Sequence, residues 1–140
     1  MKSIETLIKV HKSNLDEKRQ ELARLEGQKD EMLGYSKKMA AELQREAEFA
    51  ATDPSVSMTF ENYRRMINER QNNIFAAVSD IDKQITPIRF EISEIFNEIK
   101  KYELLLERKI AQQKSEELEI ENKNLDEIAR NNFLKAEEER

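Results

Sequence analysis

The sequence predicts an all-α protein, a long two-helix antiparallel coiled coil whose C-terminal helix projects beyond the paired region. Three observations lead to this prediction. Apolar residues recur at alternating steps of four and three, the spacing with which one helix packs along another. The 140 residues contain only 2 Gly and 2 Pro. Charged residues make up 38% of the chain, as expected when each helix buries one narrow face and exposes the rest.

The first predicted helix covers about residues 2–51. Nine of the fourteen positions in its 4-3 series are apolar, and the series runs Ile4, Ile8, His11, Leu15, Lys18, Leu22, Leu25, Lys29, Met32, Ser36, Met39, Leu43, Glu46 and Ala50. Gly27 and Gly34 each weaken a helix by about 1 kcal/mol relative to alanine. We interpret this face as a coiled-coil seam with two locally weak points.

A loop is predicted at about residues 52–58, where Thr52, Asp53, Pro54 and Ser55 form the densest group of turn residues in the chain. Thr59 could then cap a second helix through its side-chain oxygen. Because the loop is short, the two helices are expected to be antiparallel neighbours.

The second predicted helix covers about residues 59–136 and carries the stronger seam. Its core series is unbroken: Ile74, Val78, Ile81, Ile85, Ile88, Ile92, Ile95, Ile99, Tyr102 and Leu106. Pro87 lies inside this series and removes one backbone hydrogen bond. Since the heptads on both sides stay in phase, we predict a kink there and not a second turn.

The two seams are expected to pair so that facing residue numbers add to about 110, because the loop is centred near residue 55. This register places the a positions of one helix opposite the d positions of the other. The facing pairs then include Leu43 with Ile67, Met32 with Val78, Leu25 with Ile85, Leu22 with Ile88, Leu15 with Ile95 and Ile4 with Leu106. Glu46 is expected to face Arg64, and His11 to lie near Ile99.

We expect the chain to form one coiled-coil domain over residues 1–140. In the register given above, the second helix has no partner beyond about residue 107. The unpaired end would extend about 50 Å at about 1.5 Å per residue. Without burial to offset its backbone entropy, this end is expected to fray in the free protein.

Composition excludes several function classes. The net charge is −5 with mixed signs, so the basic surface of a nucleic-acid-binding protein is missing. The absence of cysteine excludes disulfides and thiolate chemistry. His11 has no catalytic neighbours, and the carboxylates of Glu116, Glu117, Glu119 and Glu121 spread around a helix instead of converging on a metal. We predict no enzyme activity, no cofactor, no metal site and a soluble protein of the cytoplasm.

Some apolar residues lie off the seam and are candidates for binding partners. Phe75 and Phe96 fall at e positions beside the seam, where packing at its edge can explain them. The candidate partner-binding residues are Tyr63, Met66, Phe90, Leu104, Leu125, Ile128 and Phe133.

The opening runs Lys2–Lys12 and Leu15–Leu22, together with Leu125–Arg130 and Phe133 near the end, resemble the FliJ family of flagellar export proteins, particularly its alphaproteobacterial members. The resemblance implies a motility protein of the type III export apparatus at the base of the flagellum. It implies a coiled-coil stalk that inserts into a hexameric export ATPase and contacts the cytoplasmic domain of the export gate, with export chaperones as further partners. The acidic end at Glu137, Glu138 and Glu139 departs from the basic tail of many members.

Two alternatives stay open. The chain could be the equivalent stalk of a virulence-type secretion system, which neighbouring flagellar genes would decide. It could also be a self-assembling scaffold or tether, because isoleucine at both a and d favours trimers or tetramers in parallel coils. Light scattering separates these classes, since the stalk is expected to be a monomer. Contact with a membrane would arise only through partners.

Overall fold

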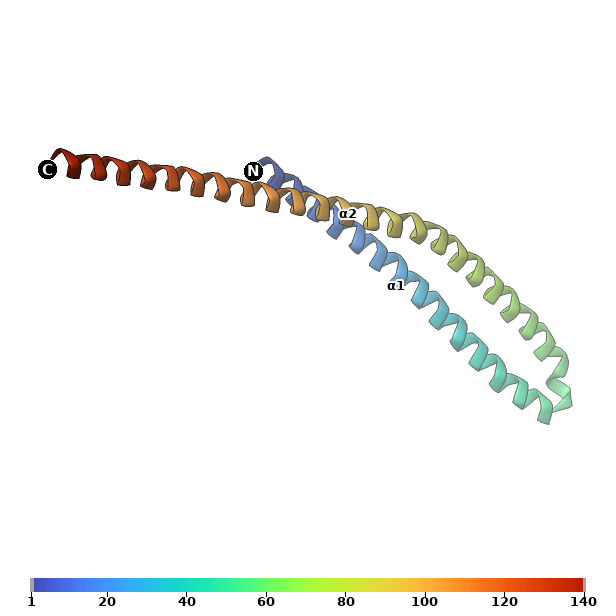
Figure 1. Ribbon diagram of the computed structural model, residues 1–140. Coiled ribbons are helices and arrows are strands. Elements are labelled where there is room, and N and C mark those ends of the chain that lie inside the picture. The colour runs from blue at the N-terminus through green and yellow to red at the C-terminus, as the bar shows by residue number, and fades with distance from the viewer. Residues whose placement is uncertain (1, 140) are drawn as a thin grey trace. The chain divides into compact units, whose positions relative to one another are not determined.

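The computed structural model describes residues 2–139 as two α-helices joined by one short 3-10 turn (Figure 1). Helix α1 spans Lys2–Thr52, η1 spans Pro54–Val56 and α2 spans Ser57–Glu138. The two α-helices pack against each other, and no described residue lies in a strand. The predicted all-α fold of two paired helices is therefore confirmed.

The connection between the helices is organised by Asp53. Its side chain accepts hydrogen bonds from the Ser55 amide at 3.1 Å and the Ser55 hydroxyl at 2.7 Å, and Pro54 follows at the first position of η1. These contacts start the new helical turn early, so α2 begins at Ser57. The prediction that Thr59 caps this helix was wrong, because Thr59 lies inside α2, and the capping contacts of the connection are made by Asp53 at the start of η1.

Contacts divide the chain into two units, residues 13–95 and residues 1–12 with 96–140. The core of the first unit is a cluster of Leu25 from α1 with Ile81, Ile85 and Ile88 from α2, each at most 7% exposed. Leu22, Met32 and Ile92 pack around it. These residues lie in the two 4-3 series, so the seam positions form the core.

The register within residues 13–95 follows from pairs that join α1 to α2. Lys29 Nζ lies 2.7 Å from Asp82 Oδ1, and Lys18 Nζ lies 2.8 Å from Glu91 Oε2. The residue numbers of these pairs add to 111 and 109. Since the later residue of α1 meets the earlier residue of α2, the helices are antiparallel, in the register expected from the short loop.

The Lys18–Glu91 pair occupies a seam position that would otherwise be apolar. Glu91 Oε2 is shielded from solvent and has no partner with regular hydrogen-bond geometry, yet the Lys18 ammonium lies 2.8 Å away. At this distance the two opposite charges form an ion pair. Interaction with Glu91 raises the pKa of Lys18 above its ordinary value. Lys18 therefore stays charged at neutral pH, and its side chain is partly buried.

A second polar layer lies nearer the loop. Ser36 is buried at 6% exposure, and the Gln71 side-chain amide donates to the Ser36 carbonyl at 3.3 Å. The expected pair between Glu46 and Arg64 is not formed, because Arg64 instead contacts Glu61 of its own helix at 2.9 Å. Residues three apart on a helix are neighbours, so the Glu61 carboxylate is within direct reach of Arg64.

Pro87 lies within α2, which continues as a helix on both sides of it. Proline cannot donate a backbone hydrogen bond to the carbonyl one turn earlier. Beside it, the Thr86 hydroxyl donates to the Asp82 carbonyl at 3.1 Å. The absence of a second turn at this point agrees with the sequence interpretation.

In the other unit, residues 2–12 of α1 pack along α2 near residues 99–106. Ile4, Ile8 and Ile99 are buried. The His11 and Tyr102 rings are stacked with centroids 5.5 Å apart, so Tyr102 lies beside His11, about one helical turn from the Ile99 position expected to face it.

Candidate partner-binding surfaces

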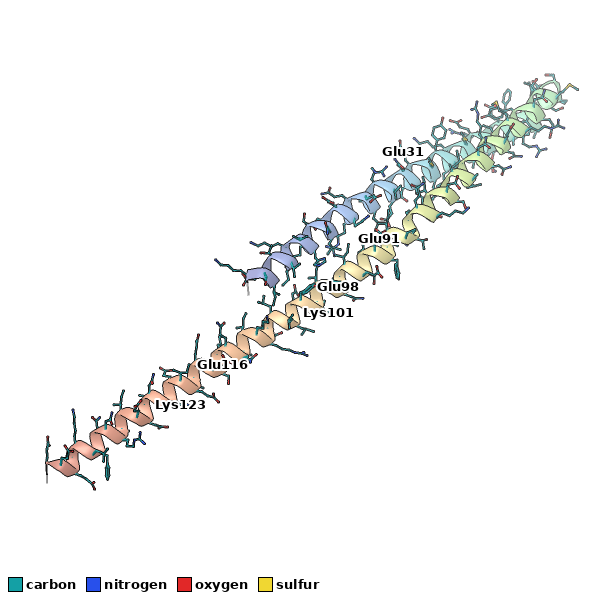
Figure 2. All side chains as sticks on the ribbon, turned by 90° about the horizontal axis from the view of Figure 1, so that it is seen from above. Glu31, Glu91, Glu98, Lys101, Glu116 and Lys123 are labelled. Carbon is teal, nitrogen blue, oxygen red and sulfur yellow. The ribbon has the colours of Figure 1, made fainter. Side chains whose placement is uncertain are left out.

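The last part of α2 has no intramolecular cover. Every residue from 107 to 139 is exposed, and Leu106 is the last residue with partial burial. Figure 1 shows this orange to red stretch continuing as helix past the start of α1, and Figure 2 shows Glu116 and Lys123 extending from it into open space. We call residues 107–139 the bare helix.

Four of the predicted binding residues lie on or beside the bare helix. The exposed fractions are 54% for Leu104, 59% for Leu125, 56% for Ile128 and 63% for Phe133. Side chains of this size gain about 1.5–3 kcal/mol each when fully buried. Their role in binding stays a prediction, and the structure places them where another protein could reach them.

The bare helix is also acidic. It contains ten Asp or Glu residues and six Lys or Arg residues. Between residues 116 and 127, six carboxylates accompany one lysine, Lys123. A partner for this segment is therefore expected to present basic groups.

The other three predicted binding residues belong to the unit of residues 13–95. Met66 and Phe90 are exposed, at 40% and 64%. Tyr63 is half-buried and lines a groove of about 360 Å³ beside the loop. We call this the loop-end groove, and its lining residues are Glu46, Phe49, Ala50, Val56, Thr59, Phe60 and Tyr63. Tyr63 therefore shares this groove with two other aromatic residues, Phe49 and Phe60.

Sequence reasoning missed two exposed aromatic residues on α1. Phe49 and Tyr35 are each 60% exposed. Phe49 lines the loop-end groove, and Tyr35 lines a second groove of about 460 Å³ with Met32 and Ile74. The signal was present in the sequence, because both residues fall off the seam of α1 just as Phe90 does on α2.

Phe75 contributes to a further groove of about 490 Å³, where Gly34 leaves open space. Phe75 is 51% exposed, so its e position gives it only partial cover from α1. Phe96, the other aromatic e residue, lies beneath the Lys100 ammonium, which is 5.3 Å from its ring centroid. Exposed aromatic residues of this kind suit protein contacts better than small-molecule chemistry.

Charged groups near the loop are held in fixed pairs. Hydrogen bonding to Arg64 lowers the pKa of the Glu61 carboxyl, and the Glu61 carboxylate raises the pKa of Arg64. Hydrogen bonds from Ser55 lower the pKa of Asp53. All three side chains therefore remain ionised near neutral pH.

Among residues 2–139, no three histidine, cysteine or acidic side chains gather in a way that could hold a metal ion. Over the same residues, neither helix contains a segment long and apolar enough to cross a bilayer.

Comparison with known protein families identifies a match over nearly the whole chain. The model of the flagellar FliJ protein family matches residues 1–138. No curated protein and no solved structure matches the chain. The match spans both helices, including the paired residues and the bare helix. This chain is therefore a member of the FliJ family of flagellar proteins, which places it with type III flagellar export.

Proposed function

We propose that the protein is the non-enzymatic central stalk of the flagellar type III export ATPase complex, acting at the cytoplasmic base of the export apparatus. Family membership supports the flagellar setting. The observation that carries the stalk role is the bare helix, which continues through residues 107–139 with every side chain exposed. A protein seldom retains so long a helix without cover unless another molecule contacts it.

The hexameric export ATPase is the partner proposed for the bare helix. A helix that fits inside a ring needs mainly polar contacts along its length and a few apolar anchors to set its depth. Leu125, Ile128 and Phe133 provide the anchors, and each is more than half exposed. The many charged residues between them supply polar contacts that water can also make.

The cytoplasmic domain of the export gate requires a second surface if it binds at the same time as the ATPase. The loop-end groove, with Phe49, Phe60 and Tyr63, provides one. Met66 and Phe90 add exposed apolar surface to the same unit. We assign this unit to the gate, and export chaperones are further candidates for its grooves.

The scaffold alternative has less support. It required the isoleucine seam to face other copies of the chain, but Ile81, Ile85 and Ile88 are buried against α1. A monomer in light scattering is therefore expected. The equivalent stalk of a virulence-type system has the same physical requirements, and the flagellar family match favours the flagellar assignment.

The test is removal of residues 118–140. The truncated protein is expected to lose stimulation of ATP hydrolysis by the purified export ATPase and to fail to restore motility. Its thermal melt should change little, because none of the described residues removed, 118–139, is buried. Full stimulation by the truncated protein would reject the bare helix as the engaging element.

A matched variant tests the assignment of the second surface. Tyr63→Ala combined with Phe49→Ala removes aromatic surface from the loop-end groove and leaves the bare helix intact. This variant is expected to stimulate the ATPase normally and to bind the gate domain more weakly. Loss of ATPase stimulation with normal gate binding would reverse the assignment.

A further inference from the structure

The bare helix carries a second 4-3 series, on a different face of α2 from the isoleucine seam. It begins at Leu104 and contains ten residues: Leu104, Arg108, Ala111, Ser115, Leu118, Asn122, Leu125, Ala129, Asn132 and Ala136. We call it the second seam. Spacing of this kind places all ten on one face of a helix that lies along another helix.

The composition of the second seam differs from that of its surroundings. Ten of the 33 residues from 107 to 139 are acidic, yet none of them occupies a position of the series. Leu118 and Leu125 are separated in the series by Asn122, and the small residues Ser115 and Ala129 lie on either side of this pair. Small residues let another helix approach closely, and its larger side chains can fill the space above them.

Two leucines of the second seam are accessible to a partner, since Leu118 is 58% and Leu125 is 59% exposed. Nothing in α1 covers this face, because the last partly buried residue of α2 is Leu106. The second seam is therefore an unpaired helix-binding face that starts beside the end of the intramolecular one.

The charge of the bare helix determines which kind of helix can bind to the second seam. Six carboxylates and one lysine lie between residues 116 and 127, and all are exposed. A second copy paired over the same face would bring two such acidic stretches together, with like charges facing each other over residues 116–127. A helix with lysine or arginine beside its own apolar seam would instead meet opposite charge.

We infer that residues 104–136 bind a single amphipathic helix of another protein, basic at the positions that flank its apolar seam. The inference goes beyond the proposed stalk role, because a ring surrounds the bare helix whereas this partner covers one face. It can therefore hold even if the ATPase binds elsewhere.

The experiment uses the full-length protein and a synthetic helical peptide of about the length of the second seam. The peptide carries leucine at its seam positions, lysine at the flanking positions and a fluorescent label. Its matched counterpart carries glutamate in place of lysine. Fluorescence anisotropy measures binding, and analytical ultracentrifugation of the protein alone measures self-association.

Two double variants distinguish binding by the second seam from binding by the opposite face of the bare helix. Leu118→Gln with Leu125→Gln alters the second seam. Ile120→Gln with Leu134→Gln alters residues of similar exposure, 60% and 51%, which lie about 160–200° around the helix from Leu118. Glutamine has good helix propensity, so both variants should keep the same far-ultraviolet circular dichroism.

We expect the lysine peptide to bind the wild type, to lose at least about tenfold in affinity for the Leu118/Leu125 variant and to stay within about twofold for the Ile120/Leu134 variant. Added salt should weaken this binding, and the glutamate peptide should not bind. The inference is overturned if the lysine peptide does not bind, if both variants bind alike, or if the glutamate peptide binds equally well. Dimerisation of the wild type that the Leu118/Leu125 variant lacks would also overturn it, in favour of a second copy.

Discussion

Residues 13–95 and residues 107–139 both contain long α-helix, but they retain it for different reasons. In the former, eight apolar side chains are buried: Leu15, Leu25, Met39, Ile67, Val78, Ile81, Ile85 and Ile88. In the latter, none is buried. Packing stabilises the first helix pair, whereas the bare helix has no intramolecular packing and depends on local propensity. Burial thus separates the part of the chain that folds by itself from the part available for binding.

The strongest challenge to this comparison is a charge placed in the seam. Ile88→Asp puts a carboxylate in the core cluster, where Ile88 is 7% exposed. Desolvation and lost packing should cost more than about 3 kcal/mol. We expect circular dichroism melts to show loss of the paired fold. Phe90→Asp is the matched control, since Phe90 is 64% exposed, and the comparison fails if this control is the more damaging change.

Pairs of introduced cysteines test which residues of α1 and α2 face each other. Leu22 packs against the cluster that contains Ile88. Cysteines at these two positions should therefore form a disulfide within one molecule under mild oxidation. Gel mobility under non-reducing conditions gives the yield. Efficient linkage of Leu22 to Ile81 or Ile95 in its place would mean that the helices are shifted by one heptad.

Glycine replacement tests whether α1 is weakened within the paired unit. A methyl group added at Gly27 or Gly34 would meet no atom within 4 Å. Alanine at either position should therefore raise the free energy of unfolding by about 0.5–1 kcal/mol, through better helix propensity. Urea unfolding measures this change. A lower stability would show that the glycines are required for a contact made in the folded protein.

The smallest effect is expected from pH. The pKa of Lys18 is raised in the folded state by Glu91. This contribution to stability is fully present below the ordinary lysine pKa and is lost as pH rises through the raised value. Urea unfolding across the alkaline range should show this loss, and Lys18→Gln should remove that part of the pH dependence. If stability depends on pH in the alkaline range in the same way in the variant and the wild type, the Lys18–Glu91 pair does not contribute to stability.

Much of the fold could be predicted because the isoleucine seam has a single period and the loop is short. The period fixed which residues face inward, and the loop limited the register. The helix start was missed by two residues, since Asp53 caps η1 before Thr59 can act. The pair of Glu46 with Arg64 was wrong because heptad position cannot show that Glu61 offers a nearer partner.

The exposure of the candidate binding residues could be predicted, whereas their role in binding stays a prediction. The candidate residues of the bare helix are exposed, and near the loop Tyr63 lines a groove while Met66 is exposed. Phe49 and Tyr35 were missed because off-seam aromatic residues were sought on only one helix. Which partner meets which surface depends on the partner's own structure, so no pattern in this chain alone could specify it.

Hydrogen exchange on the full-length protein, alone and with the export ATPase, tests the division between folding and binding most directly. Without the ATPase, amides of residues 13–95 should exchange slowly and those of 107–139 quickly, because only the former are stabilised by burial. Addition of the ATPase should slow exchange in residues 107–139 and leave residues 13–95 nearly unchanged. Slow exchange of the bare helix in the free protein, or ATPase protection confined to residues 13–95, would contradict the account.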